Sequence, residues 1–129
     1  MKLAASTQPR VRAGSDPRKG RCLVAAQAIR RGELIEAAPA AVFSSDDARL
    51  IDQTPLFDYY FRWQGDIKKG GSGAIAFGLV SLCNHASQPN ATVHPNYGEN
   101  TLDLYAATDI AAGEEITIRY WSLWFEPVP

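Results

Sequence analysis

The sequence predicts an α+β domain that is mostly β, with many short strands and one or two short helices. First, short apolar or alternating runs recur along the chain, and glycine and proline turns separate them. Second, the stretch after Ser45 carries the signals of a short helix. Third, 129 residues are the size of one domain, and the 46% apolar and 21% charged content is ordinary for a globular protein. We find neither an internal repeat nor an interdomain linker.

The first third of the chain predicts strands separated by turns. Residues 1–9 are polar and without pattern, so we expect a disordered N-terminus and a single domain over residues 10–129. Strands are expected at 10–13, 21–28, 33–36 and 40–44, with turns at 14–17 and 29–33. Pro39 is expected to end the third of these strands, because proline cannot donate to a sheet ladder.

The middle of the chain, residues 45–82, is where we expect the helices. Ser45 can cap a short helix that begins near Asp46, where acidic residues favour the first turn, and Pro55 ends that segment. The aromatic stretch 57–63 suits either a strand or a helical turn, and 65–73 suits a loop. Residues 74–82 are apolar and suit a buried helix or a buried strand, which periodicity cannot separate over so short a run.

The last third predicts three more strands. Residues 84–90 are irregular, 91–94 suit a short strand and 95–100 a turn. Residues 102–106 alternate as a half-buried strand should, and 115–119 suit the last strand. An aromatic tail follows at 121–129.

Charge and cysteine content exclude several classes of function. The net charge is −1, from 13 basic and 14 acidic residues, so we predict no direct nucleic-acid binding. No apolar run is long enough for a bilayer or resembles a signal peptide, so we predict no membrane association. Two cysteines and two histidines lack paired ligand spacing, so we predict no metal site. The default is a reduced, intracellular, cytoplasmic protein.

Residues 84–90 read Asn-His-Ala-Ser-Gln-Pro-Asn and follow an apolar run. Asn84 and His85 could project an amide and an imidazole from a buried base, which suits recognition of a purine edge. The alternative is a turn in which the Asn84 side chain caps its own backbone.

Residues 113–120 read Gly-Glu-Glu-Ile-Thr-Ile-Arg-Tyr. Alone, they would be a turn and an edge strand with a packed tyrosine. Together, the two segments resemble the signature motifs of the SET domain, Asn-His-Ser-Cys-x-Pro-Asn and Gly-Glu-Glu-Leu-Thr-x-x-Tyr. Four of the six specified positions of the first motif match at unaltered spacing, and the second differs mainly by Ile116. SET domains are protein lysine methyltransferases that use S-adenosylmethionine (AdoMet).

Two further segments extend this resemblance to roughly residues 10–125. Residues 19–25 are similar to the family's Gly-x-Gly element, with Gly20 retained and Cys22 in place of the second glycine. Residues 29–35 match the turn and strand that follow, and residues 58–61 lie where small members carry a channel tyrosine. Without flanking cysteine-rich modules, the chain resembles the minimal viral and bacterial members.

The resemblance implies a SET fold, β-clip-like, with small sheets and a pseudoknot-like crossing near the C-terminus. It implies AdoMet as cofactor and a lysine-bearing protein or peptide as partner. Tyr120 and Tyr59 are the implied catalytic residues, and the implied substrate channel consists of Tyr59, Tyr60, Ile118 and Tyr120. The implied cofactor-binding residues are Gly20, Arg21, Cys22, Leu23, Asn84, His85, Trp124 and Phe125.

The implied reaction sets requirements on this channel. The attacking lysine amine must be neutral, although free lysine has a pKa of about 10.4. An apolar channel next to a sulfonium would lower that pKa, and aromatic walls would exclude water. Tyr120 is expected to orient the amine rather than act as a free base. Ile118 stands where many members carry a limiting aromatic residue, which favours higher methylation states.

Two other functions stay open. Cys22, Ala86 and Ser87 depart from the family pattern, as they would in a non-catalytic SET-like binding module. A methyltransferase for a non-lysine amine is the second alternative. The aromatic tail also predicts a possible homodimer, because such a surface favours burial.

Overall fold

The computed structural model describes residues 9–120. Its smaller sheet has the strand order β1–β2–β9–β6, formed by Val11–Asp16, Gly20–Ala25, Glu115–Ile118 and Asn84–His85. The β1–β2 and β2–β9 pairs are antiparallel, whereas β6 runs parallel to β9. This sheet therefore joins the N-terminal hairpin to two segments from the second half of the chain.

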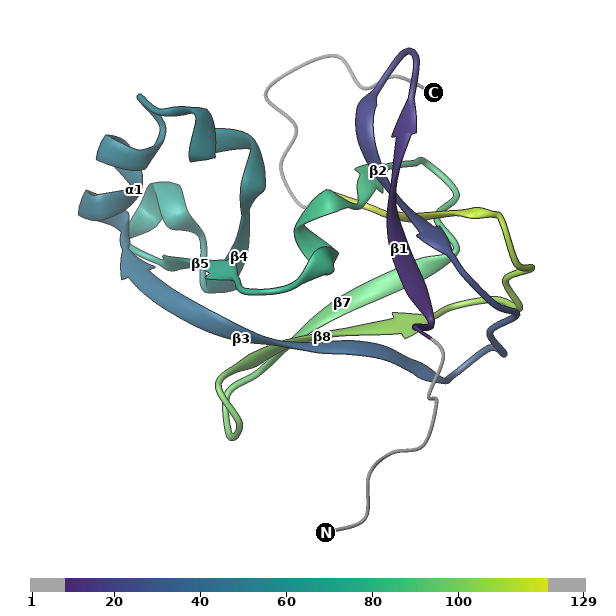
Figure 1. Cartoon of the computed structure of the whole chain (residues 1–129). Helices are drawn as coiled ribbons and strands as arrows, with labels where there is room; N and C mark the ends of the chain where they lie inside the picture. The colour runs from purple at the N-terminus through teal and green to yellow at the C-terminus, as the bar shows by residue number, and fades with distance from the viewer. Residues whose placement is uncertain (1–8, 121–129) are drawn as a thin grey trace, which may run out of the picture.

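The larger sheet is antiparallel and has the order β4–β5–β3–β8–β7. Its strands are Tyr60–Gln64, Ser72–Ala76, Leu34–Ser44, Thr101–Ala106 and Ala91–Asn96. The central strand β3 pairs with β8 along its first half and with β5 along its second half. Figure 1 shows β3 crossing the molecule from the side of the β1–β2 hairpin to the side of α1, β4 and β5.

Short helices connect these strands. The helix α1 spans Ser45–Ile51, and its N-cap is Ser44, whose Oγ accepts a hydrogen bond from the Asp47 N–H at 3.2 Å. The predicted cap at Ser45 is thus wrong by one residue. Three 3₁₀ helices follow within the described residues: η1 (Pro55–Tyr59), η2 (Ile67–Lys69) and η3 (Leu79–Leu82). The ambiguous run 74–82 holds both kinds of element, the end of β5 and η3.

Pro39 does not end its strand, contrary to the prediction. The strand β3 continues through it for 11 residues. Pro39 is the last residue paired with β8 and directly precedes the first residue paired with β5. Its carbonyl still accepts a hydrogen bond from the Phe77 N–H at 2.8 Å. A proline at the point where β3 changes its partner strand destabilises the sheet little, because neither ladder has to continue through the missing N–H.

The predicted turn at 14–17 is also displaced. The strand β1 continues to Asp16, so Gly14 lies inside it. Asp16 Oδ1 accepts the N–H groups of Arg18 and Lys19 at 2.8 and 3.0 Å, which stabilises the turn that follows. Gly20 then adopts a φ of 82°, a conformation that favours glycine.

The core lies between the two sheets and beneath η3. Its largest fully buried side chains are those of Leu23, Ile29, Val80, Leu102, Leu104, Ile110 and Ile116. Burial of one such side chain stabilises the fold by about 1.5–3 kcal/mol. Leu23, Ile116 and Val80 anchor β2, β9 and η3, and the segment that begins at Asn84 follows η3 and pairs with β9.

The fold class predicted from the sequence is confirmed. The predicted crossing appears where the expected irregular segment begins, because β6 pairs with β9 at Asn84–Thr117 and His85–Ile118. The Ala86 N–H also donates to the Ile118 carbonyl at 2.9 Å. Segments about thirty residues apart in sequence therefore lie side by side.

Candidate active site

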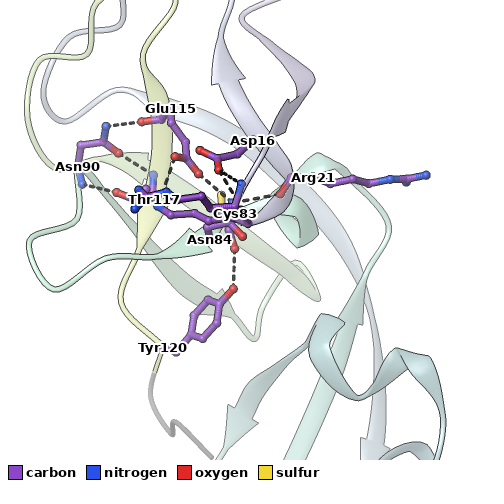
Figure 2. A network of polar contacts seen from close by, with 10 residues as sticks. Asp16, Arg21, Cys83, Asn84, Asn90, Glu115, Thr117 and Tyr120 are labelled. Atoms are coloured by element: carbon purple, nitrogen blue, oxygen red, sulfur yellow. Dashed lines mark hydrogen bonds and ion pairs between the residues drawn. The ribbon is translucent and has the colours of Figure 1, made fainter. Parts of the chain in front are cut away.

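Asn84 ties three strands of the smaller sheet together. Its Nδ2 donates to the Arg21 carbonyl at 3.1 Å and to Oε2 of Glu115 at 2.8 Å (Figure 2). The other carboxylate oxygen of Glu115 lies 3.6 Å from Nζ of Lys19, and both side chains are largely buried. The Asn84 side chain is therefore held by contacts across the sheet rather than by its own turn.

Asn90 fixes the other end of the same segment to β9. Its Nδ2 donates to the Glu115 carbonyl at 2.8 Å, and its Oδ1 accepts the Thr117 N–H at 2.9 Å (Figure 2). The Asn90 N–H also donates to Oγ1 of Thr117 at 3.4 Å. One amide side chain thereby satisfies two backbone groups that the short β6 leaves unpaired.

His85 contacts the residue that ends the described chain. The Tyr120 N–H donates to Nδ1 of His85 at 3.0 Å, and the two ring centroids are 5.3 Å apart. An accepting Nδ1 means a neutral imidazole with its proton on Nε2. Burial, followed by the positive charges of Arg119 and Lys19, lowers the pKa of His85 and keeps the ring neutral.

The hydroxyl of Tyr120 donates to the backbone carbonyl of Cys83 at 2.9 Å (Figure 2). Burial, together with nearby groups that become negative on ionisation, raises the pKa of Tyr120 to about 12. Burial also raises the pKa of the Cys83 thiol. At neutral pH both groups are therefore protonated, and the tyrosine oxygen keeps its acceptor capacity.

A cavity of about 740 Å³ opens beside this network. Its walls include Lys19, Arg21, Asn84, His85 and Tyr120. Small-molecule sites in proteins usually enclose about 300–1,000 Å³, so this cavity has the size of a cofactor site. Basic side chains from the β1–β2 turn line one part of it, which suits an anionic ligand group.

A second cavity of about 420 Å³ lies between the two edge strands of the larger sheet, β4 and β7. Part of its wall is common to both cavities. The shared lining consists of Phe57, Asp58, Tyr59, Tyr60, Ile67, Ser81, Cys83 and Tyr120. The two cavities thus meet at a junction where half of the shared residues are aromatic.

The three tyrosines predicted for the channel all line this junction. The Tyr60 hydroxyl donates to Oδ1 of Asp52 at 2.7 Å, and its ring packs edge-on against Phe43 at 5.1 Å. Burial and the Asp52 carboxylate raise the pKa of Tyr60. Tyr59 is 41% exposed and therefore lies at the open side of the junction. Ile118 is buried and lines only the smaller cavity.

The predicted cofactor residues divide into three groups. Arg21, Asn84 and His85 line the larger cavity. Gly20, Cys22 and Leu23 lie in β2 and do not line it, so their role stays a prediction. Trp124 and Phe125 lie outside the described residues.

Sequence reasoning missed four residues that the structure brings to this site. Glu115 and Asn90 hold the crossing, and Ser81 and Cys83 line both cavities. In the sequence, only their positions inside or shortly before the two motifs could have indicated a role at this site.

Within residues 9–120, no three His, Cys, Asp or Glu side chains form a cluster suited to a metal ion. Over the same residues, no helix has the length and apolarity that crossing a membrane requires.

Comparison with known proteins agrees with this geometry. The SET domain family model matches residues 20–121. A curated relative from Schizosaccharomyces pombe, named "Histone-lysine N-methyltransferase, H3 lysine-37 specific", is 32% identical over 111 residues. That match covers 84% of this chain and 72% of the relative.

Solved structures share the fold. A chain from Plasmodium falciparum, described as a candidate histone methyltransferase, is 25% identical with a TM-score of 0.66. The match covers 92% of this chain and 99% of that one. A chain of the complex ctPRC2 is 26% identical with a TM-score of 0.68, and the match covers 87% of this chain but only 14% of that one.

Proposed function

This chain belongs to the SET-domain family of protein lysine methyltransferases, and from that premise we propose that it is itself an AdoMet-dependent protein-lysine N-methyltransferase. The observation that carries the proposal is the shared wall of the two cavities, where Tyr59, Tyr60 and Tyr120 meet. Such a junction lets a cofactor and a peptide enter from different sides and meet in a narrow aromatic channel.

The larger cavity fits AdoMet in size and in the character of its lining. Asn84 and His85 would bind the cofactor by side chain and backbone, and the basic Arg21 suits its carboxylate end. We further assign backbone contacts to Gly20, Cys22 and Leu23, and stacking on the adenine to Trp124 or Phe125. When bound, AdoMet supplies an electrophilic methyl group on a sulfonium.

The smaller cavity would receive the substrate lysine. Its aromatic junction would pack the aliphatic stem and exclude water, which favours the neutral amine that the reaction requires. Alignment of the amine within this junction would supply most of the rate. Because position 118 in the wall of this cavity is isoleucine rather than an aromatic residue, we propose that the cavity has room for a methylated amine and therefore for more than one transfer.

Tyr120 would orient the amine through its hydroxyl oxygen. That hydroxyl donates its proton to the Cys83 carbonyl at 2.9 Å, and a phenolic oxygen that donates can also accept a hydrogen bond, here from the amine. With a pKa of about 12, Tyr120 is not a base at neutral pH, so the lysine proton would leave to solvent. Tyr59 would complete the channel from its open side.

The substrate we propose is a lysine in a basic protein, with histone tails as the first class to test. The curated relative is named for a histone lysine, which is the basis of this choice. The homodimer predicted from the aromatic tail stays a prediction, since that tail lies outside the described residues. The cytoplasmic location also stays a prediction.

Calorimetric titration with AdoMet and with its demethylated product tests the cofactor assignment. Wild-type protein should bind both, and Asn84→Ala should bind neither, because the bridge between Arg21 and Glu115 is lost. Gln88→Ala is the matched control, since Gln88 is exposed in the same segment. Absence of binding by the wild type would favour the non-catalytic module.

A methyl-transfer assay with histone peptides tests the acceptor. Lysine peptides should be methylated, and the same peptides with arginine in place of lysine should not. Tyr120→Phe should retain cofactor binding and lose about a hundredfold or more in rate, as expected for a residue that orients a reacting group. Methylation of the lysine-free peptides at a free amine would instead support the alternative acceptor.

A further inference from the structure

Glu36 in β3 caps a helix that leads into the site. Its two carboxylate oxygens accept the first two N–H groups of η3, from Leu79 at 3.0 Å and from Val80 at 2.8 Å. The first N–H groups of a helix have no partner inside it, and Gly78 at the N-cap makes no side-chain cap. The carboxylate of Glu36 therefore takes the place of a local cap.

The backbone on both sides fits this contact. The pairing of β3 with β8 shifts between Leu34 and Glu36, a bulge of the kind that re-aims a side chain. On the other side, a Cβ on Gly78 would lie 2.7 Å from Oε1 of Glu36 and 2.9 Å from Cβ of Ala38. The backbone of Gly78 is extended, with φ at −177°, so it is the space for the carboxylate that requires glycine.

The far end of η3 reaches the proposed channel. The Cys83 N–H donates to the Val80 carbonyl at 3.1 Å, and the Cys83 carbonyl accepts the Tyr120 hydroxyl at 2.9 Å. Val80 is fully buried, so the side-chain packing around it holds η3 in place. A shift of the first turn of η3 would therefore also shift Cys83 at its other end. A continuous set of hydrogen bonds therefore runs from Glu36 through η3 to the Tyr120 hydroxyl.

We propose that Glu36 is a positioning residue for methyl transfer: it fixes the start of η3 so that the Cys83 carbonyl orients the Tyr120 hydroxyl. This inference rests on the proposed function, because an oriented hydroxyl affects the rate only if Tyr120 lines a working channel. A carboxylate suits the role because it accepts both hydrogen bonds and is charged, which makes each of them stronger.

Glu36→Gln tests the proposal, because an amide retains the shape but has only one accepting oxygen. We expect kcat for a lysine peptide to fall about tenfold or more, as displacement of a reacting group costs. AdoMet affinity should stay within about twofold, because Asn84 is held by Arg21 and Glu115 rather than by η3. Glu33→Gln is the control, since Glu33 directly precedes the same strand and its carboxylate accepts the Arg30 N–H rather than an N–H of η3.

Fluorine NMR of fluorotyrosine-labelled protein provides a readout that does not need turnover. Tyr120→Phe assigns the resonance of residue 120. Glu36→Gln should shift or broaden that resonance and leave that of Tyr97 unchanged, because the Tyr97 hydroxyl donates to the Trp63 carbonyl, away from the pairing of Glu36 with β8. Gly78→Ala should have the same effect on kcat and on the resonance, because its Cβ displaces the carboxylate. The effects of the two variants on kcat should be less than additive in free energy, because both break the contact of Glu36 with η3, although the Cβ of Gly78→Ala also approaches Ala38.

Wild-type kcat together with an unchanged residue 120 resonance in Glu36→Gln would overturn the proposal. If that variant does not fold, Gly78→Ala decides between the same two outcomes. If wild-type protein methylates no lysine peptide, the proposed function fails instead. The fluorine resonance would then still show whether Glu36 positions the tyrosine.

Discussion

Tyr120 is held at both ends by residues two positions apart in the sequence. Its backbone N–H donates to Nδ1 of His85 at 3.0 Å, and its hydroxyl donates to the carbonyl of Cys83 at 2.9 Å. Both acceptors flank or belong to β6, whose pairing with β9 brings them to Tyr120. The two sequence motifs are thus two halves of one structure, and the position of Tyr120 depends on both.

The hydrogen bond from Tyr120 predicts that stability depends on the protonation of His85. The pKa of His85 is lowered in the folded protein, chiefly by burial, whereas an unfolded histidine has a pKa of about 6.5. The unfolded state therefore binds the proton first. The free energy of unfolding should fall as the pH drops below about 6.5, by at most about 1.4 kcal/mol per pH unit, and level off below the folded pKa.

Urea unfolding at a series of pH values measures this dependence. His85→Asn retains a hydrogen-bond acceptor for the Tyr120 N–H but does not titrate, so its unfolding free energy should be flatter over that range. His94→Asn is the control, because His94 is exposed in β7 and its Nε2 lies 3.2 Å from Oγ1 of Thr92. Equal slopes for wild type and His85→Asn would contradict the prediction.

A raised Tyr120 pKa predicts the shape of the pH–rate profile. Tyr120 has a pKa of about 12 and stays protonated throughout the working range. The value of kcat/KM for a lysine peptide should therefore rise from about pH 7 to about pH 10 as the amine deprotonates, without a descending limb. Measurements should end near pH 10, because an unfolded tyrosine ionises there and stability begins to fall.

Methyl transfer by wild type and by Tyr120→Phe should be compared across this range. Both profiles should rise in parallel, with the variant lower at every pH. A descending limb below about pH 10 that disappears in Tyr120→Phe would mean that the hydroxyl ionises during the reaction, contrary to its burial.

Local patterns in the sequence located most of the elements. Alternation predicted the strand at 102–106, and the Gly-Glu turn predicted the last strand. The boundaries failed where the partner strand changes, as at Pro39, because local propensity does not include which neighbour a strand pairs with. The short β6 was expected as irregular, since only its pairing with β9 makes it a strand.

The site depends even more on distant contacts. The bridge from Asn84 to Glu115 spans 31 residues and the cap from Glu36 to Val80 spans 44, so no window of sequence contains both partners. Resemblance to a family could pair the two motifs, because it brings in a known fold. It could not find the role of Cys83, whose contribution is a backbone carbonyl and does not depend on a recognisable side chain.

Asn90 should be important for stability. Its side chain makes one hydrogen bond to the Glu115 carbonyl and one to the Thr117 N–H, both partly buried. Asn90→Ala leaves both backbone groups without that partner, and we expect a loss of about 2–4 kcal/mol in the free energy of unfolding. Asn90→Asp should also destabilise, because a carboxylate would face the Glu115 carbonyl. Gln88→Ala should change stability by less than about 0.5 kcal/mol in the same urea titration.

Cys22 is the clearest departure from the family pattern, and the structure connects it to Gly14. The two residues are paired across β1 and β2. A Cβ on Gly14 would lie 2.8 Å from Cγ2 of Val24 and 3.1 Å from Sγ of Cys22. The missing side chain at Gly14 therefore leaves room for the thiol, which is buried. Cys22 is thus a packing residue in β2 that replaces a glycine without entering the larger cavity.

Cys22→Gly should consequently lower the stability of the fold and leave the affinity for AdoMet unchanged. We expect a loss of about 1–2 kcal/mol in the free energy of unfolding, from the buried side chain and from glycine in a strand. AdoMet affinity should stay within about twofold of wild type. Gly14→Ala should cost about 1–3 kcal/mol by overpacking, and the double variant should cost less than the sum, because one of the two close contacts is gone. A tenfold gain in AdoMet affinity for Cys22→Gly would show instead that the thiol obstructs the cofactor, and would favour the binding module over the enzyme.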